Sequence, residues 1–255
     1  MRLALMLIFL SNFIQAQSPD SIASPNIESG NSVAQPIIYM LAGLGLDPRA
    51  FEKLKFHSDT VYYLDWIEPL PHEKIAHYAK RLIELQMDSV HQKGPIILIG
   101  HSFGGVMMQE IAQQLGDIQK VILISSIHSQ KEKPASLRHW GWMPIYWTIN
   151  KGMIKGSFPL WAKKYGYKTK ESRQLFRSMV SRFSNRYHRW ATRSIARWRP
   201  TPFPKNIPII RIHGNKDRMF PIKRIAAPDY IVEGGNHFMI WEDAEALSKV
   251  LGTLY

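Results

Sequence analysis

The segment of residues 95–105 constrains the fold of this 255-residue chain more than any other part of it. Residues 96–99 are an unbroken run of isoleucine and leucine, which is typical of a parallel strand buried on both faces. The sequence Gly-His-Ser-Phe-Gly-Gly follows, so Ser102 has a glycine two positions before it and two positions after it. Such small residues let a strand and a helix approach closely at a sharp turn. The segment therefore predicts a buried strand, a turn that carries Ser102, and the start of a helix.

A helix is predicted after this turn because apolar residues recur at helical spacing before a glycine: Val106, Met107, Ile111, Leu115 and Gly116. The amino end of this helix is expected beneath Ser102, where its dipole favours a developing negative charge. A strand before the serine and a helix after it are the context in which a Gly-x-Ser-x-Gly motif indicates a nucleophile. We therefore predict that Ser102 is a nucleophile, the alternative being an inert serine in a turn.

Hydrophobic residues make up 45% of the chain and aromatic residues 11%, which excludes a disordered protein. The length suits one α/β domain that carries an insertion. Because the chain has no cysteine, disulfides, thiolate metal sites and a cysteine nucleophile are excluded. We see no cluster of metal ligands in the sequence and expect neither a metal nor a cofactor.

Residues 1–16 contain Arg2, an apolar run and a terminal Ala16, and they resemble a secretory signal peptide. They predict export to the periplasm or out of the cell, while an uncleaved membrane anchor and a cytoplasmic location stay open as alternatives. Residues 17–36 are rich in Ser, Pro, Asn and Gly without periodicity, which predicts a flexible linker. The folded domain is expected over residues 37–254.

Segments with strand and helix patterns alternate along this domain. Besides residues 96–99, strands are expected at residues 37–41, 61–64, 121–124, 207–214 (a strand and turn) and 229–232. Long helices are expected at residues 72–91, with Ile75, Tyr78, Leu82 and Leu85 inward, and 241–254, with Ala246, Leu247, Val250 and Leu251 inward. This alternation predicts an α/β fold with a mostly parallel central sheet and flanking helices.

Two further polar residues follow strands at the edge where Ser102 is expected. Asp217 comes after the strand that starts at residue 207, and His237 comes after the last strand. The chemistry requires these residue types, because an imidazole can take the serine proton and a buried carboxylate can orient the imidazole. We predict that Ser102, Asp217 and His237 are catalytic. Glu233 is a weaker rival for the acid, and Asp65 is a third choice.

A glycine-rich turn follows the first strand, in the sequence Ala-Gly-Leu-Gly at residues 42–45. Acyl-transfer enzymes place an oxyanion donor at such a turn near the serine. We predict that the backbone N–H groups of Leu44 and Phe103 form the oxyanion hole, the alternative being an ordinary tight turn. His101 and His213 are expected to be structural residues near the strand ends.

The chain resembles proteins of the α/β-hydrolase fold, of the capped single-domain kind, over residues 37–254. The resemblance rests on four motifs, L-A-G-L-G, G-H-S-F-G-G, H-G-N-K-D-R and G-G-N-H-F, at residues 41–45, 100–105, 213–218 and 234–238. It implies a helical cap, expected here at about residues 128–205. Two departures are Ala42, where many relatives have His, and the absence of an evident antiparallel hairpin before the first strand.

The expected cap contains nearly all of the positive charge. Residues 131–205 hold 18 Lys and Arg but only Glu132 and Glu171 as acids, whereas the whole chain has a net charge of +13. Five arginines recur at helical spacing in residues 172–198, which are expected as one long helix or two: Arg182, Arg186, Arg189, Arg193 and Arg197. Besides a solvated face, an anionic membrane surface or an acidic ester is an expected partner, and the absence of a binding motif argues against nucleic acid.

These residues predict a serine hydrolase that cleaves a carboxylic ester through an acyl-enzyme. A thioester or an amide is a less favoured substrate, and the fold also hosts acyltransferases and other reactions. The alternative from another class is a non-catalytic module that holds an anionic partner on its basic cap. The complete Ser–Asp–His set favours the enzyme.

Overall fold

The computed structural model describes residues 36–56, 60–87, 94–140 and 144–255. The predicted signal peptide at residues 1–16 lies outside the described residues, as does the predicted linker except for Pro36. No helix in the described part of the chain is long and apolar enough to cross a membrane.

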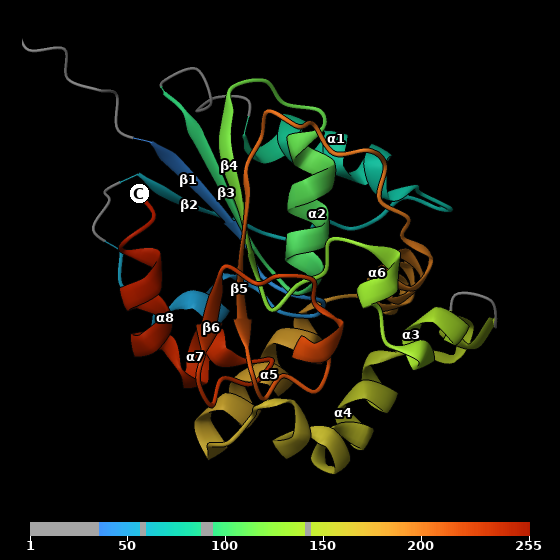
Figure 1. Cartoon of the computed structure of the whole chain (residues 1–255). Helices are drawn as coiled ribbons and strands as arrows, with labels where there is room; N and C mark the ends of the chain where they lie inside the picture. Colours follow the sequence, from blue (N-terminus) through green and yellow to red (C-terminus); the bar gives the residue numbers. More distant parts are fainter. Residues whose placement is uncertain (1–35, 57–59, 88–93, 141–143) are drawn as a thin grey trace, which may run out of the picture. The chain divides into compact units, whose positions relative to one another are not determined.

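Six parallel strands form one sheet in the order β2-β1-β3-β4-β5-β6 (Figure 1). Their bounds are β1 Ile37–Leu41, β2 Val61–Leu64, β3 Ile96–His101, β4 Ile118–Ile124, β5 Ile209–Gly214 and β6 Tyr230–Val232. The central strand β3 is buried along its whole length, as its run of aliphatic residues predicts. The predicted parallel sheet of an α/β fold is therefore confirmed, and within the described residues no antiparallel strand precedes β1.

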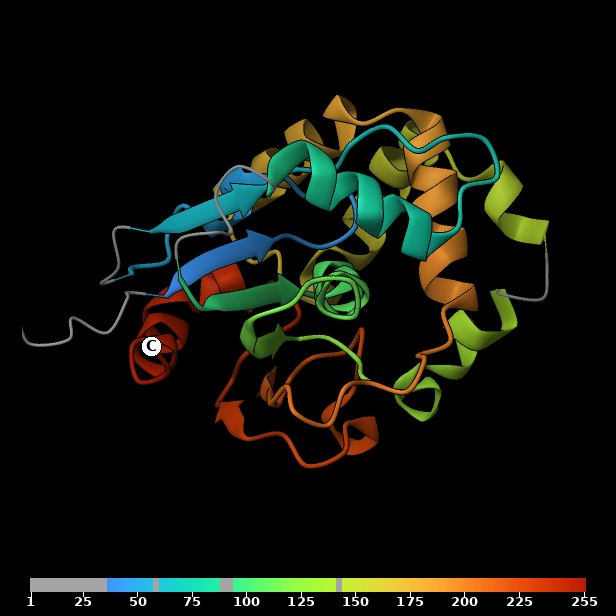
Figure 2. The same cartoon turned by 90° about the horizontal axis from the view of Figure 1, so that it is seen from above.

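Helices cover both faces of this sheet, so that two apolar cores form. One core packs alternate residues of β1, β3 and β4 against α1 (Ile75–Gln86), α2 (Phe103–Ala112) and α6 (Asn185–Arg197). The other packs the remaining strand residues against α5 (Lys170–Arg182), α7 (Met239–Glu242) and α8 (Ala244–Leu251). Figure 2 shows α2 and α8 on opposite sides of the strands. The central strands β1 and β3 are therefore buried on both faces.

The helices differ from the predicted ones at their ends. Helix α1 begins at Ile75, not at residue 72, and ends at Gln86; its buried residues are Tyr78, Ala79, Leu82 and Ile83, whereas Leu85 is 64% exposed. Helix α2 ends at Ala112, so Gly116 does not cap it. The predicted closing helix is split into α7 and α8, and its buried face uses Ala244 in place of the exposed Ala246.

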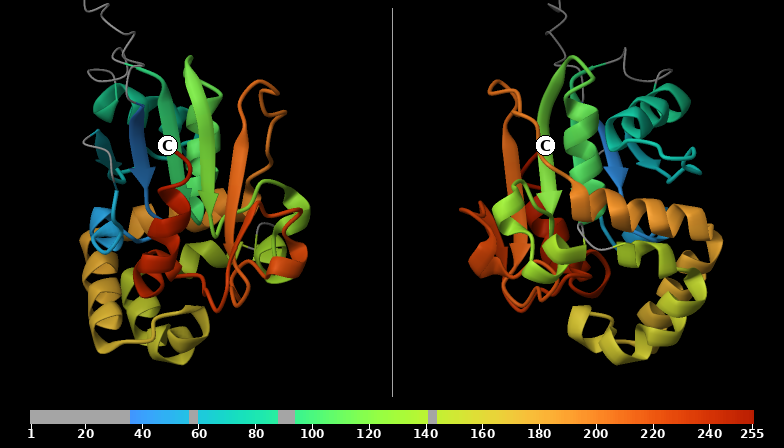
Figure 3. Two further views of the ribbon diagram at one scale, coloured as in Figure 1. Left: turned by 60° about the vertical axis from the view of Figure 1, so that its left-hand side comes forward. Right: turned by 90° about the vertical axis from the view of Figure 1, so that its right-hand side faces the viewer.

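The insertion between β4 and β5 contains α3 (Ala135–Trp140), η4 (Pro144–Thr148), α4 (Lys151–Trp161), η5 (Lys163–Tyr165), α5 and α6. Residues 172–198 form two helices, because Ser184 caps α6 by accepting a hydrogen bond from the Tyr187 N–H at 3.0 Å. In Figure 3 the carboxyl ends of the strands point toward this insertion.

Helix α6 belongs to the insertion, but it packs into the apolar core of the domain. The ring of Trp190 stacks on Tyr78 of α1 at 4.1 Å between centroids, and its indole N–H donates to the Glu73 carbonyl. At the other end of α6, the buried Lys133 donates to the carbonyls of Ala196 and Trp198. A cation at this end is favourable because the last carbonyls of a helix lack partners within the helix.

Candidate active site

Ser102 occupies a strained turn between β3 and α2. Its backbone angles are φ 52° and ψ −120°, which is rare for a residue other than glycine. Gly100 and Gly104 make the turn possible, because a Cβ on Gly104 would overlap the carbonyl oxygen of Leu41 and one on Gly100 would overlap Gly105. This sharp turn places the serine at the amino end of α2.

The structure brings Ser102, His237 and Asp217 together at the carboxyl edge of the sheet. Nε2 of His237 lies 2.9 Å from Oγ of Ser102, and Nδ1 of His237 lies 2.9 Å from Oδ2 of Asp217. Asp217 follows β5 and His237 follows β6, so parallel strands deliver all three side chains to one place. A serine, an imidazole and a carboxylate therefore form one hydrogen-bonded chain.

The carboxylate of Asp217 is buried, and both of its oxygens accept hydrogen bonds. Its Oδ1 accepts hydrogen bonds from the backbone N–H groups of Met219 at 2.7 Å and Phe220 at 2.9 Å. Burial would raise the pKa of Asp217, but the imidazole of His237 and these hydrogen bonds outweigh burial and lower that pKa. The carboxylate is therefore held ionised and in a fixed orientation against His237.

His101 is buried beside this chain and supports it. Its Nε2 lies 2.8 Å from the carbonyl oxygen of His237, so Nε2 carries the proton and donates it. Burial, followed by the nearby His237, lowers the pKa of His101 to about 3, which keeps its ring neutral. The prediction of a structural role holds, but the sequence contained no sign that His101 would bind the backbone of His237.

The other residues considered for the site lie elsewhere or act indirectly. His213 donates to the Phe220 carbonyl and lies 3.4 Å from Asp217 Oδ2, so it packs behind the carboxylate. Glu233 is exposed and bonded to Asn215, whereas Asp65 binds Arg182. Neither of these two acids contacts His237.

The glycine-rich turn after β1 adjoins the serine. The N–H of Leu46 donates to the carbonyl of Gly43 at 3.0 Å, and Gly45 has a φ of 73°. A Cβ built on Gly43 would lie 3.1 Å from the Cβ of Ser102, which places the turn against the serine. In the described part of the chain, neither the Leu44 N–H nor the Phe103 N–H donates a hydrogen bond to a protein group. Both groups stay available as donors.

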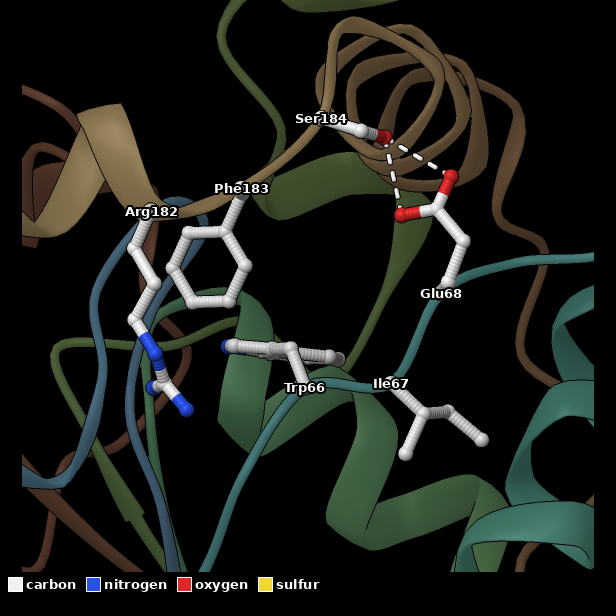
Figure 4. A pocket seen from close by; sticks show the side chains of 6 residues that line it. All are labelled: Trp66, Ile67, Glu68, Arg182, Phe183 and Ser184. Atoms are coloured by element: carbon white, nitrogen blue, oxygen red, sulfur yellow. Dashed lines mark hydrogen bonds between the residues drawn. The ribbon is translucent and has the colours of Figure 1, made fainter.

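The side chains of the candidate site are almost inaccessible to solvent. Ser102 is 8% exposed and His237 is 9% exposed. A cavity of about 240 Å³ lies where the loop after β2 meets the α5–α6 junction (Figure 4), and it is lined by Trp66, Ile67, Glu68, Arg182, Phe183 and Ser184. Trp66, which lines this cavity, also stacks on Phe103, the residue after the serine.

The five arginines that were predicted to meet an anionic partner, or else to form a solvated face, make contacts within the fold. Arg182 binds Asp65 and lies 3.6 Å from Asp47, and Arg186 binds Glu68 at 2.7 Å. The remaining three bind the carbonyl of Ile149 or stack over Tyr146: Arg189, Arg193 and Arg197. Almost no acidic residues are close to these arginines in the sequence. The acids that pair with them in the structure come from loops of the core.

A match to the alpha/beta hydrolase family spans residues 38–250 of the sequence. The chain belongs to the alpha/beta hydrolase family. In the described residues, this hydrolase has no group of three or more His, Asp or Glu side chains placed to hold a metal ion. No curated protein matches its sequence.

Solved structures share the fold of this alpha/beta hydrolase at low identity. An esterase from Exiguobacterium antarcticum is 16% identical with a TM-score of 0.64, covering 86% of this chain and 91% of that one. A putative lipase from Acinetobacter baumannii is 18% identical with a TM-score of 0.62, covering 86% and 82%. A bromoperoxidase from Bacillus anthracis is 16% identical with a TM-score of 0.62, covering 86% and 91%. The fold is thus shared by proteins with different reactions.

Proposed function

We propose that this alpha/beta hydrolase is a serine hydrolase that cleaves a carboxylic ester through an acyl-enzyme. Ser102 is the nucleophile, His237 is the general base and acid, and Asp217 orients His237. The observation that carries the proposal is the chain of two 2.9 Å contacts that joins Ser102, His237 and Asp217. A structural serine would need neither the strained backbone at Ser102 nor an imidazole within hydrogen-bond distance.

In the first half-reaction, Oγ of Ser102 attacks the ester carbonyl carbon while its proton passes to Nε2 of His237. The electron pair of the carbonyl bond moves to the carbonyl oxygen and gives a tetrahedral oxyanion. When this intermediate collapses, the carbon–oxygen bond to the alcohol breaks and the protonated His237 gives its proton to the departing alkoxide. The acyl group remains bound to Ser102.

In the second half-reaction, water replaces the alcohol. Nε2 of His237 takes a proton from water as the water oxygen attacks the acyl carbon. Collapse of the second oxyanion breaks the bond to Ser102, and the proton on His237 returns to Oγ. The products are an alcohol and a carboxylic acid, and the ionised Asp217 stabilises the imidazolium in both steps.

The oxyanion is assigned to the N–H groups of Leu44 and Phe103. Both segments adjoin the serine, since Phe103 follows it in the chain and the turn at Gly43 lies against its Cβ. Each donor aimed at a developing oxyanion is worth about 3 kcal/mol of barrier. Because neither N–H group donates to another protein group among the described residues, neither has to break a hydrogen bond with those residues before it binds the oxyanion.

The proposal is tested by turnover of p-nitrophenyl acetate, butyrate and octanoate, with a matching thioester and anilide. We expect turnover of at least one ester by the wild type and a loss of about 10⁴-fold or more in Ser102→Ala. Ser178→Ala, an exposed serine on α5, serves as the matched control and should retain wild-type rates. A folded wild-type protein that turns over none of these compounds would overturn the proposal and favour the non-catalytic binding module.

A further inference from the structure

Helix α4, in the cap, exposes large apolar side chains on its outer face. Leu160 is 87% exposed and Met153 is 46% exposed, while Phe158 on the opposite side of the helix is buried. Residues seven apart on a helix lie on one face, so Met153 and Leu160 form a single apolar edge. Figures 1 and 3 show α4 at the outer edge of the cap, away from the strands.

Six lysines lie in and just after α4, and all but one of them lack an acidic partner among the described residues. Residues 151–170 contain six lysines and no Asp or Glu: Lys151, Lys155, Lys163, Lys164, Lys168 and Lys170. Among the described residues, only Lys168 of these six forms an ion pair, with Asp243 at 3.1 Å. The four in α4 and η5 are exposed, so their charge faces solvent. This positive charge is not neutralised within the fold, in contrast to that of Arg182 and Arg186.

The backbone of α4 permits a close approach to a flat partner. Gly152 and Gly156 are exposed between the lysines and the apolar edge, and a Cβ on Gly156 would contact nothing within 4 Å. Two glycines weaken a helix of this length. Packing does not require Gly156, whereas a Cβ on Gly152 would lie 3.1 Å from Oδ1 of Asn150, which caps α4. The outer face of α4 therefore offers apolar tips beside an exposed glycine backbone, and the exposed Lys163 and Lys164 of η5 follow it in the chain.

We propose that the outer face of α4 and η5 docks onto an anionic lipid surface. Leu160 and Met153 insert among the acyl chains near the headgroups, and Lys163 and Lys164 of η5 contact the anionic headgroups. The apolar tips favour lipid over nucleic acid, because a phosphate backbone offers no partner for Leu160. The outer face of α4 and η5, and not the arginine stripe of α5 and α6, is thus the surface that contacts the membrane.

This docking does not depend on the hydrolase chemistry, so the two can fail separately. The primary measurement is sedimentation of the full-length protein with vesicles of phosphatidylcholine, with and without phosphatidylglycerol. We expect tight binding only with phosphatidylglycerol, weakened strongly by salt because exposed charges are screened. The Ser102→Ala variant should bind vesicles as the wild type does, which separates binding from turnover.

Variants of each part of the face sharpen the test. Each lysine is worth about fivefold in partition, so Lys163→Gln/Lys164→Gln should bind about 25-fold more weakly. Met153→Ser/Leu160→Ser should bind about tenfold more weakly or worse, because it removes the inserted apolar surface. Two controls match them, Lys80→Gln/Lys223→Gln and Leu85→Ser, which change exposed residues outside the face. The thermal transition of each variant verifies folding.

Three results would overturn the proposal. The first is equal binding to vesicles with and without phosphatidylglycerol, or no binding to either. The second is binding that both sets of α4 and η5 variants leave unchanged. The third is binding of duplex DNA in a mobility shift that Lys163→Gln/Lys164→Gln abolishes while Met153→Ser/Leu160→Ser retains it, since that pattern assigns the face to nucleic acid.

Discussion

Trp66 lies face to face with Phe103, with ring centroids 5.0 Å apart and planes 10° apart. The indole N–H of Trp66 also donates to the carbonyl of Gly43 at 3.2 Å. One side chain of the loop after β2 therefore braces both segments that carry the proposed oxyanion donors, the one after Ser102 and the turn that contains Leu44.

Replacing Trp66 with Phe should keep much of the stacking and remove the hydrogen bond to Gly43. Because a typical hydrogen bond contributes about 1 kcal/mol, we expect kcat to fall about two- to tenfold. KM should change less, since the turn holds an oxyanion that exists only in the transition state. Steady-state kinetics on an accepted ester measures both constants, with Trp147→Phe as an exposed control. An unchanged kcat would contradict the bracing role.

The Asp217→Asn substitution should reduce kcat by about 10⁴-fold, because an amide no longer holds the productive tautomer of His237 or stabilises its imidazolium. Glu233→Gln provides the matched control, since Glu233 is exposed and bonded to Asn215. Equal losses in the two variants would contradict the assignment of Asp217 as the acid.

Gly104→Ala should prevent stable folding. A Cβ at this position would overlap the carbonyl oxygen of Leu41, and β1 cannot move without disturbing the centre of the sheet. We expect a loss of about 4 kcal/mol or more in the free energy of unfolding. Gly116→Ala, where a Cβ would contact nothing within 4 Å, should change that free energy by about 0.5 kcal/mol or less. Urea denaturation and soluble yield distinguish the two, and a wild-type melting transition for Gly104→Ala would refute the overlap.

Acid should destabilise the protein through His101. Burial lowers the pKa of His101 from 6.5 to about 3, so the unfolded chain takes up this proton below pH 6.5 while the folded chain does not. The contribution is present above pH 6.5 and is lost as the pH falls from 6.5 toward 3. Between pH 7 and pH 5 we expect the unfolding free energy to fall by about 2 kcal/mol from this group.

Urea denaturation at several pH values checks this expectation. His101→Gln should reduce the dependence between pH 7 and pH 5 without abolishing it, because burial also lowers the pKa of His128, His188 and His213. Exposed His139→Gln should leave the dependence as in the wild type. An equal dependence in wild type and His101→Gln would show that His101 is not the group that titrates.

The insertion between β4 and β5 is anchored to the sheet by a buried ion pair between its Glu132 and Arg211 of β5, 2.8 Å apart. Arg211→Leu leaves the carboxylate of Glu132 buried with only backbone donors, so we expect a loss of about 3–5 kcal/mol in unfolding free energy. The double variant Arg211→Leu/Glu132→Leu should recover most of that loss. A double variant as unstable as the sum of the two single variants would contradict the pairing argument.

The sequence predicted the parts of this fold that depend on local pattern. The strand before Ser102 and the glycines around it belong to one short segment, so the residues themselves specified the turn. The ends and the buried faces of helices were harder to predict from the sequence. Packing against α2 and α6 determines which residues of α1 are buried, and Leu85 is exposed although its spacing fits the apolar stripe. Tertiary contacts thus override a periodic pattern at its margins.

Contacts between distant segments account for what the sequence did not reveal. Arg182 and Arg186 are far in sequence from Asp65 and Glu68, so the sequence alone does not predict these two ion pairs within the fold. The contact of His101 with the backbone of His237 likewise joins the end of β3 to a loop 136 residues away. The sequence motifs therefore predicted the chemical groups of the site, whereas these supporting contacts became visible only in the folded structure.

The central claim is that Ser102 is an activated nucleophile, and intact-mass analysis after treatment with a fluorophosphonate probe tests it most directly. The probe reacts with an activated serine whatever the natural substrate is. The account predicts a single adduct on the wild type and none on Ser102→Ala or His237→Ala. A folded wild type that forms no adduct, with anionic vesicles also present, would contradict it, as would an adduct that Ser102→Ala retains.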